Sequence, residues 1–283
     1  MPSQKPVALV VGASRGIGRQ VAVDLAKNGY AVVVAAKSIS DPSKPIPFPP
    51  NPKSQDSTIT TVTQEIIHAG GDATAIQVDV RDEKSVQKLI DDTIAKYGRL
   101  DVIVYNSGAI WWSSVATTPS SATSSCSAST QRASTPRFFR GKTAYAMGKI
   151  GMSVLTKGLA MDFEREGLKD MSITSIWPAV AIESAATEKF SKQNPDDEKD
   201  LRKPTIFSDA ILAILAAPPA KVNGELLLDE DFLREYAGVT DFAKYDVVPG
   251  SNPRRIMPAR LPDLTVAEQD DEGKRFDSAK SKL

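Results

Sequence analysis

Tyr145 and Lys149 have the residue types and the spacing that most directly suggest chemistry. They stand four positions apart in TAYAMGKIGMSVLTKGLAMDFERE, residues 143–166, a stretch that predicts a helix, and residues at this spacing share one helix face. A phenol with a pKa of about 10 is a poor acid or base at neutral pH, but a neighbouring ammonium group lowers that pKa. The pair could therefore exchange a proton with a substrate, although many amphipathic helices carry the same spacing without any active site.

A glycine-rich turn near the N-terminus could hold phosphate groups. VALVV, residues 7–11, predicts a strand buried on both faces, and RQVAVDLAKNG, residues 19–29, predicts a helix. Between them lies G-x-x-x-G-x-G, whose glycines let the backbone turn sharply and approach a diphosphate at the helix start. The alternative, a tight turn without a ligand, is disfavoured by this strand–turn–helix context. The candidate cofactor-binding residues of the turn are Gly12, Ser14, Arg15, Gly16, Ile17 and Gly18.

The elements that must position these residues alternate between strand and helix along the chain. Such alternation predicts βαβ units, and therefore a single-domain α/β fold with a doubly wound parallel sheet of the Rossmann type. The predicted strands cover residues 7–11, 30–36, 73–80, 100–108, 172–178 and 224–230. The predicted helices cover residues 19–29, 57–71, 83–98, 143–166 and 207–217.

The end of the second predicted strand bears on the choice of cofactor. In folds of this type an acidic residue there binds the ribose 2′-hydroxyl of NAD. Here the strand runs into Lys37, and Arg15 lies in the glycine turn. Both cations suit a 2′-phosphate, so we expect NADP rather than NAD, unless Lys37 is an ordinary solvated lysine.

Bulk composition excludes several kinds of partner. The chain has 35 basic and 35 acidic residues, so its formal net charge of zero gives no reason to expect nucleic acid or an acidic membrane as a partner. One cysteine, Cys126, cannot form an internal disulfide and fits a reducing compartment. No apolar run is long enough to span a bilayer, and no metal site is expected.

Several motifs together resemble the short-chain dehydrogenase/reductase family. VGASRGIG resembles the family's nucleotide motif, YNSG at 105–108 resembles its N-N-A-G, and Tyr145-Ala-Met-Gly-Lys149 matches its Y-x-x-x-K. WPAVAIESAA stands in place of the usual P-G turn. The resemblance runs from residue 7 to residue 250 apart from residues 111–139. AAKS, VDVRDE, GMSVLTKGLAMDF and LLDEDFLRE resemble the hydroxysteroid dehydrogenase-like branch that carries a peroxisomal ending.

This resemblance implies an oxidoreductase that transfers hydride between a nicotinamide and a carbonyl or secondary alcohol. Tyr145 would exchange a proton with the substrate oxygen, while Lys149 would also hold the nicotinamide ribose. Asn106 and Gly108 would help seat the cofactor, and Asp79 with Val80 would flank the adenine. The complete set of further cofactor-binding candidates is Lys37, Asp79, Val80, Asn106, Gly108, Tyr145, Lys149 and Pro178.

The stretch between the fourth strand and Tyr145 departs from the family. There the family has a long helix with an asparagine of the catalytic tetrad, and then a central strand that ends in the catalytic serine. Residues 117–137 are instead rich in Ser, Thr and Ala, without apolar periodicity. We therefore expect a fold that lacks one central strand and most of one helix. No serine can be assigned as catalytic, and homo-oligomerisation is in doubt because the family's dimer surface uses the lost helix.

A change of reading frame would explain this segment. Residues 120–134 can be back-translated so that the frame starting one base upstream reads KRYQLMQRVNPEGLY. That text resembles the family's helix, including its M-x-x-x-N-x-x-G pattern, although codon degeneracy leaves freedom in the choice of bases. Our hypothesis is that a mispredicted intron or altered splicing shifted the frame and removed the following strand.

The ends and insertions complete the predicted organisation. Residues 1–250 form the Rossmann domain, with a proline-rich surface insertion at 41–56, and residues 251–283 form a flexible tail. The tail ends in Ser281-Lys282-Leu283, the tripeptide that addresses proteins to peroxisomes, so we expect recognition by the import receptor. No sterol-carrier domain is expected, because the chain stops too soon after the predicted domain.

Three functions compete at this point. The first is an NADP-dependent oxidoreductase that acts on a carbonyl or secondary alcohol. A peroxisomal setting is consistent with lipid-derived substrates, and we expect the activity of this chain to be impaired. The second is a non-catalytic nucleotide-binding protein that keeps the glycine turn. The third is a mis-spliced gene product that does not fold stably.

Overall fold

The computed structural model describes residues 5–40, 57–108, 143–184, 187–188 and 191–257. Three predicted features lie outside the described residues: the proline-rich insertion at 41–56, the segment at 117–137 and the terminal Ser281-Lys282-Leu283.

Strands and helices alternate in the order that the sequence predicts. The strands are β1 (Val7–Val11), β2 (Ala31–Ala36), β3 (Asp72–Gln77), β4 (Val102–Tyr105), β5 (Ser175–Trp177), β6 (Ala181–Ile182), β7 (Leu201–Arg202) and β8 (Leu226–Leu228). The α-helices are α1 (Gly16–Lys27), α2 (Ile59–His68), α3 (Glu83–Tyr97), α5 (Thr143–Arg165), α7 (Thr205–Ala216), α8 (Pro219–Val222) and α9 (Asp229–Glu235). Two 3₁₀ helices are η2 (Pro195–Asp200) and η3 (Ala243–Tyr245).

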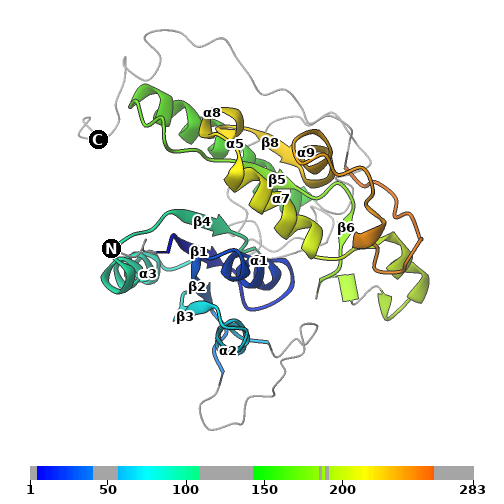
Figure 1. Cartoon of the computed structure of the whole chain (residues 1–283), viewed down its shortest axis with the longest axis horizontal. Coiled ribbons are helices and arrows are strands. Elements are labelled where there is room, and N and C mark those ends of the chain that lie inside the picture. Colours follow the sequence, from blue (N-terminus) through cyan, green and yellow to red (C-terminus); the bar gives the residue numbers. More distant parts are fainter. Residues whose placement is uncertain (1–4, 41–56, 109–142, 185–186, 189–190, 258–283) are drawn as a thin grey trace.

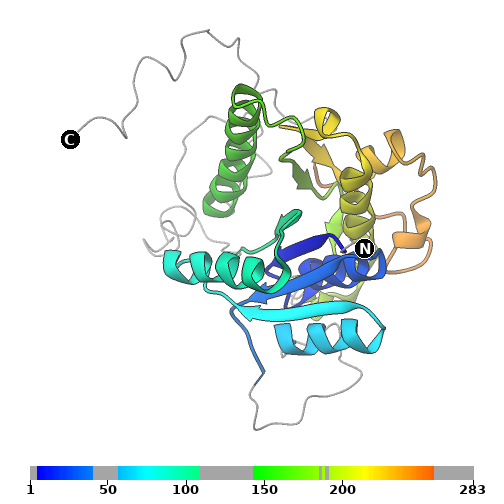
Figure 2. The same cartoon turned by 60° about the vertical axis from the view of Figure 1, so that its left-hand side comes forward.

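The main sheet has four parallel strands in the order β3-β2-β1-β4. Every residue of β1 is buried, because alternate side chains enter two hydrophobic clusters on opposite faces. One cluster joins the sheet to α1, α2 and α7, and the other joins it to α3 (Figures 1 and 2). This arrangement confirms the predicted α/β fold with helices on both faces of a parallel sheet.

The remaining strands form two short pairs. β5 pairs in parallel with β8, and β6 pairs with β7. Within the described residues, β4 has β1 as its partner on one edge and no partner on the other. Ile103 and Tyr105 of β4 are 59% and 56% exposed there. The predicted loss of a central strand concerns this edge, and it stays a prediction because residues 109–142 lie outside the described part.

The C-terminal region differs from the prediction in two respects. The strand predicted over 224–230 ends at Leu228, and Asp229 begins α9, because the apolar run LLL is followed by three acidic residues suited to a helix start. Residues 251–257, predicted as the beginning of a flexible tail, are held in place. Val180 forms an antiparallel bridge with Arg255, and the Ile256 N–H donates to the Ala179 carbonyl at 2.8 Å.

Candidate functional site

The glycine turn leaves β1 in a conformation that favours glycine. Gly12 and Gly16 have φ values of +86° and +57°, in the left-handed region. The N–H groups of Gly12 and Ala13 both donate to the Ala35 carbonyl of β2, at 2.7 and 3.1 Å. The turn is therefore fixed to the sheet before the chain enters α1.

The glycines also allow close approach between the turn and the end of β4. A Cβ at Gly12 would lie 2.8 Å from the Cα of Ser107. A Cβ at Gly18 would collide with the Gly12 carbonyl and would lie 2.8 Å from Nδ2 of Asn106. A side chain at either position would fill the cradle between turn and strand, so this backbone fits the close approach of a dinucleotide diphosphate.

The start of α1 suits an anion. Arg15 occupies the position before the helix with extended backbone, its side chain makes no capping hydrogen bond, and the first turn carries no acidic residue. The helix start therefore offers backbone N–H groups and positive potential to a phosphate. Ser14 is buried, and Ile17 packs against the core, so the prediction for these two residues concerns their backbone.

Asn106 and Gly108 connect this turn to α5. The Asn106 N–H donates to the Val11 carbonyl at 2.9 Å, and its Nδ2 lies 3.5 Å from the Gly12 carbonyl. Nζ of Lys149 lies 3.7 Å from the position that a Cβ at Gly108 would take. The structure thus brings together three motifs that lie far apart in the sequence: the glycine turn, the end of β4 and the Lys149 helix.

The two predicted catalytic residues lie on α5. Tyr145 and Lys149 are one helical turn apart, and the side chain of Tyr145 lies outside the described part of the structure. Burial lowers the pKa of Lys149, because the ammonium group loses contact with water. A partly desolvated cation acts more strongly on a neighbouring group than a fully hydrated one.

The segment after β5 closes the site on another side. Nε1 of Trp177 donates to Oγ of Ser153 on α5 at 3.2 Å, which fixes the strand end beside the helix that carries Lys149. Pro178 follows directly and is half-buried. Farther along, Cβ of Ser184 lies 3.8 Å from the Cβ position at Gly16. The residues from Pro178 to Ser184 therefore run from α5 to the glycine turn.

A charged cluster lies at the ends of β2 and β3. Lys37 donates to Oδ2 of Asp79 at 3.0 Å, and Arg81 donates to both oxygens of Asp79 at 2.9 and 2.6 Å. The Arg81 and Lys37 bonds hold the pKa of Asp79 well below its usual range. The sequence prediction included Lys37 and Asp79 but missed Arg81. Val80, also predicted, packs against the hydrophobic cluster that contains Leu89.

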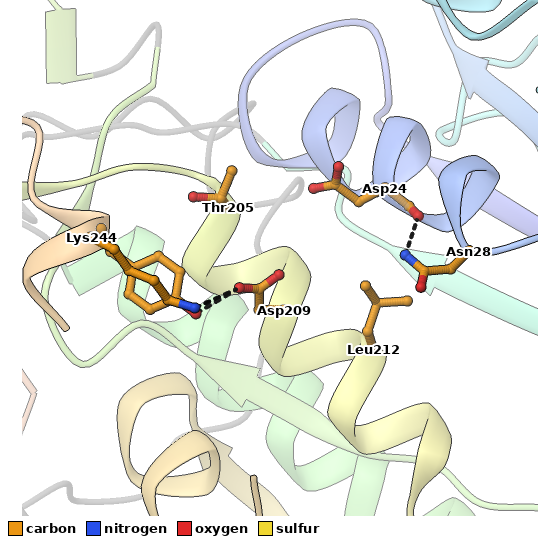
Figure 3. Close-up of a pocket in the computed structure, with 7 residues that line it drawn as sticks. Asp24, Asn28, Thr205, Asp209, Leu212 and Lys244 are labelled. Carbon is orange, nitrogen blue, oxygen red and sulfur yellow. Dashed lines mark hydrogen bonds and ion pairs between the residues drawn. The ribbon is translucent and has the colours of Figure 1, made fainter. Parts of the chain in front are cut away.

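A cavity of about 300 Å³ lies elsewhere, between α1 and α7 (Figure 3). Asp24 stands eight residues after Gly16, or about 12 Å along the helix, so this cavity is separate from the glycine turn. Both of its carboxylates already accept hydrogen bonds: Asp24 accepts from Ser208 at 2.8 Å, and Asp209 accepts from Tyr245 at 2.6 Å. We assign it no function. The lining residues are Asp24, Asn28, Thr205, Asp209, Leu212, Lys244 and Tyr245.

Within the part of the chain that the structure describes, no helix combines the length and apolar character needed to cross a membrane. In the same residues, no group of three or more His, Cys, Asp or Glu side chains is arranged to hold a metal ion.

Comparison with known proteins identifies a similar family. The profile of the short chain dehydrogenase family matches residues 6–46 and 53–134, which contain the glycine turn and Asn106. Hydroxysteroid dehydrogenase-like protein 2 of Danio rerio is 31% identical over 269 residues, covering 85% of this chain and 60% of that protein. The human protein of the same name is 30% identical over the same length. These matches make the chain similar to the short-chain dehydrogenase/reductase family over most of its length.

A solved family member agrees in its fold. The crystal structure of a short chain dehydrogenase from Mycobacterium thermoresistibile has a TM-score of 0.71 and 28% sequence identity, and covers 88% of this chain and 92% of that one. Short-chain dehydrogenases/reductases bind a nicotinamide cofactor on this fold. The chain spans about 60% of the length of the curated relatives, so their activities are not transferred to it directly.

Proposed function

We propose that this protein is an NADP-dependent oxidoreductase that transfers hydride between the nicotinamide and a carbonyl or secondary alcohol. One observation carries the proposal: Nζ of Lys149 lies 3.7 Å from the Cβ position at Gly108, so the Y-x-x-x-K helix meets the end of β4 beside the glycine turn. This position of Lys149 supports an active site rather than a chance occurrence of the tyrosine–lysine spacing.

Each site residue has a separate role in the proposed reaction. When bound, the nicotinamide would supply the hydride that reduces the carbonyl carbon of the substrate. Tyr145 gives its phenolic proton to the carbonyl oxygen, which becomes the alcohol, and the resulting phenolate is later reprotonated from solvent. Lys149 stabilises that phenolate through its positive charge and binds the nicotinamide ribose. The glycine turn and the start of α1 would hold the diphosphate, Asn106 supports the turn, and Pro178, which follows β5, would contact the cofactor.

The preference for NADP rests on the cations near the adenosine side. Lys37 and Arg81 sit where the second and third strands end, and Arg15 lies in the glycine turn. Asp79 holds both cations in place but also neutralises part of their charge. A 2′-phosphate would share Lys37 and Arg81 with Asp79, and it would gain charge-assisted hydrogen bonds from them.

The setting that we propose is the peroxisome, with import through Ser281-Lys282-Leu283 and a lipid-derived carbonyl or alcohol as substrate. The relatives named hydroxysteroid dehydrogenase-like protein 2 support the lipid class by their name alone. We also propose that turnover is impaired, because residues 117–137 lack the periodicity of the family's helix and strand.

Cofactor oxidation tests the catalytic proposal. The purified chain is mixed with NADPH and a panel of ketones and acyl-derived carbonyls, and absorbance at the nicotinamide band is followed. We expect slow but measurable turnover that Tyr145→Phe abolishes, since the proton donor is lost. Cofactor binding without any turnover supports the non-catalytic alternative, and turnover at ordinary enzyme rates contradicts the proposed impairment.

Sequencing the transcript across codons 115–140 tests the origin of the unusual segment. A message whose bases also encode KRYQLMQRVNPEGLY in the shifted frame supports altered splicing or a mispredicted intron. An uninterrupted frame whose bases do not give that text contradicts the hypothesis.

A further inference from the structure

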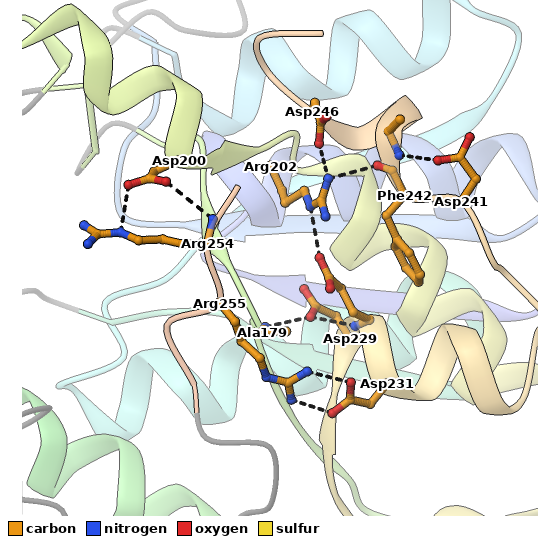
Figure 4. Close-up of polar contacts among 12 residues, drawn as sticks. Ala179, Asp200, Arg202, Asp229, Asp231, Asp241, Phe242, Asp246, Arg254 and Arg255 are labelled. Atoms are coloured by element: carbon orange, nitrogen blue, oxygen red, sulfur yellow. Dashed lines mark hydrogen bonds and ion pairs between the residues drawn. The ribbon is translucent and has the colours of Figure 1, made fainter. Parts of the chain in front are cut away.

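The peptide of Ala179 is held by hydrogen bonds from two directions. Its N–H donates to Oδ1 of Asp229 at 2.7 Å, and the same oxygen accepts the Glu230 N–H at 2.8 Å (Figure 4). Its carbonyl accepts N–H groups from Ile256 and Met257, at 2.8 and 3.2 Å. Both polar atoms of this peptide are thus bonded to segments that lie far along the chain.

Asp229 is an unusual residue for a purely packing role. Its side chain is buried, with 1% of the residue exposed, and burial of a carboxyl group is costly unless hydrogen bonds compensate. Those bonds go to backbone N–H groups on two segments, one in α9 and one in the turn after β5. The carboxyl group therefore joins α9 to that turn.

The carbonyl side of Ala179 is supported by an anchored segment. Arg255 donates through both terminal nitrogens to the two oxygens of Asp231, at 2.8 and 2.6 Å. This bidentate pair holds residues 255–257 against α9 (Figure 4). Asp229 and Asp231 thus act from the same short helix on the two sides of one peptide.

The position of this peptide links it to the cofactor site. It follows Pro178, and Trp177 is bonded to Ser153 on α5. The same segment reaches the glycine turn at Ser184, against Gly16. A shift of the Ala179 peptide would move the wall between the Lys149 helix and the glycine turn.

We propose that Asp229 is a positioning residue, which holds the turn of residues 178–180 in the conformation that receives the nicotinamide end of the cofactor. The inference rests on the proposed function, since it assumes that this turn faces the cofactor. The side chain acts through Oδ1, the oxygen that accepts the Ala179 and Glu230 N–H groups. An asparagine, which keeps Oδ1 but has no charge, should therefore preserve most of the effect.

The test compares three variants by NADPH fluorescence titration and by hydrogen exchange of the 178–182 backbone without cofactor. Asp229→Ala removes the acceptor, and it should raise the Kd for NADPH about five- to tenfold and speed exchange at Ala179. Asp229→Asn should stay within about twofold of wild type in both measurements. The matched control is Asp241→Ala, since Asp241 also accepts a backbone N–H, from Ala243 at 2.8 Å, but is exposed and away from the turn.

Each outcome decides a separate question. Equal Kd values for wild type and Asp229→Ala would overturn the inference, and so would a loss in Asp229→Asn as large as in Asp229→Ala. A folded wild type that binds no NADPH would overturn the proposed function, while the exchange measurement would still show whether Asp229 holds the turn. If Asp229→Ala does not unfold cooperatively, Asp229→Leu replaces it, because leucine keeps the volume and lacks the acceptor.

Discussion

Lys149 and Lys37 are both predicted to contact the cofactor, but the structure places their charges in different surroundings. Lys149 is partly desolvated, which lowers its pKa and strengthens its electrostatic effect on its neighbours. The side chain of Lys37 is 67% exposed and pairs with Asp79. The first suits a part in proton exchange, and the second suits recognition of a phosphate at the protein surface.

Removal of the surface cations should change the choice between cofactors. Lys37→Ala and Arg81→Ala should each weaken NADPH binding by about tenfold and leave NADH binding within about twofold, since only NADPH carries the 2′-phosphate. Asp79→Asn should favour NADPH, because it frees both cations. Fluorescence titration measures both cofactors, and Lys88→Ala, which removes another exposed pair, is the control. An unchanged ratio of the two Kd values in Lys37→Ala and Arg81→Ala would argue against NADP specificity.

Asp229 should also make stability depend on pH. Burial raises its pKa to about 7, above the 3.8 of an ordinary aspartate, with smaller contributions from Glu230 and Asp231. Between these values the folded chain keeps a proton that the unfolded chain has lost, so this group lowers the free energy of unfolding as pH rises. Tyr245 and Arg255 also interact electrostatically with Asp229, and Arg202 pairs with the adjacent Glu230.

Asp229→Asn removes this titration. Relative to the variant, wild type should lose about 2–3 kcal/mol of unfolding free energy between pH 5 and pH 8, and no more above that. Urea unfolding at several pH values measures the difference. Parallel pH profiles for the two proteins would show that Asp229 does not carry the raised pKa.

At the scale of elements, Arg202 joins the short strand β7 to the short helix α9 and to the segment around η3. It lies on β7 and donates to Glu230 of α9 at 2.9 Å, to the Phe242 carbonyl at 3.0 Å, and to Asp246. All three charged side chains are buried. Two buried carboxylates thus depend on one guanidinium group.

Arg202→Ala should therefore destabilise the protein by about 3–5 kcal/mol, because it leaves Glu230 and Asp246 buried without their cation. Thermal unfolding measures the loss as a lower Tm. Lys199→Ala, which breaks the exposed pair with Asp196, is the control and should leave Tm unchanged. A similar small change in both variants would mean that the Arg202 cluster is not coupled to folding.

The sequence predicted the helices and strands correctly where their apolar residues repeat regularly over a long stretch. The apolar run of β1, the glycine turn and the amphipathic helices carry their own signals, because buried strands and helix faces need regular spacing. It could not predict β6 and β7, which have two residues each and depend on pairing with each other. Nor could the sequence show that Arg255 pairs with Asp231, because the two residues lie on separate segments.

The candidate site was predictable to the same extent. The glycines, Asn106 and Lys149 belong to motifs, and the structure places them together. Arg81 and Asp229 carry no such signal. An arginine beside an aspartate is common on surfaces, and an aspartate after a strand is an ordinary helix start. Their roles become visible only from their partners.

At the scale of the whole molecule, the described part consists of the four-stranded sheet with its helices and a C-terminal part whose helix α7 packs into the same hydrophobic cluster as α1. The main sheet ends at β4 within the described residues, while β5 and β8 form their own pair. The family profile extends to residue 134 and stops before α5. The elements predicted to hold the dinucleotide diphosphate, from β1 to β4, are therefore all described, whereas residues 109–142, between β4 and α5, lie outside the described residues.

Binding of NADPH to the folded chain tests the central claim most directly, because the glycine turn, the start of α1 and the end of β4, which are proposed to hold the diphosphate, all lie in the described part of the chain. The nicotinamide fluorescence of NADPH is measured as purified protein is added, after circular dichroism has confirmed cooperative unfolding. The account predicts a saturable change with a Kd of about 1 mM or tighter, and weaker binding of NADH. A well-folded chain that gives no saturable signal with either cofactor would contradict it.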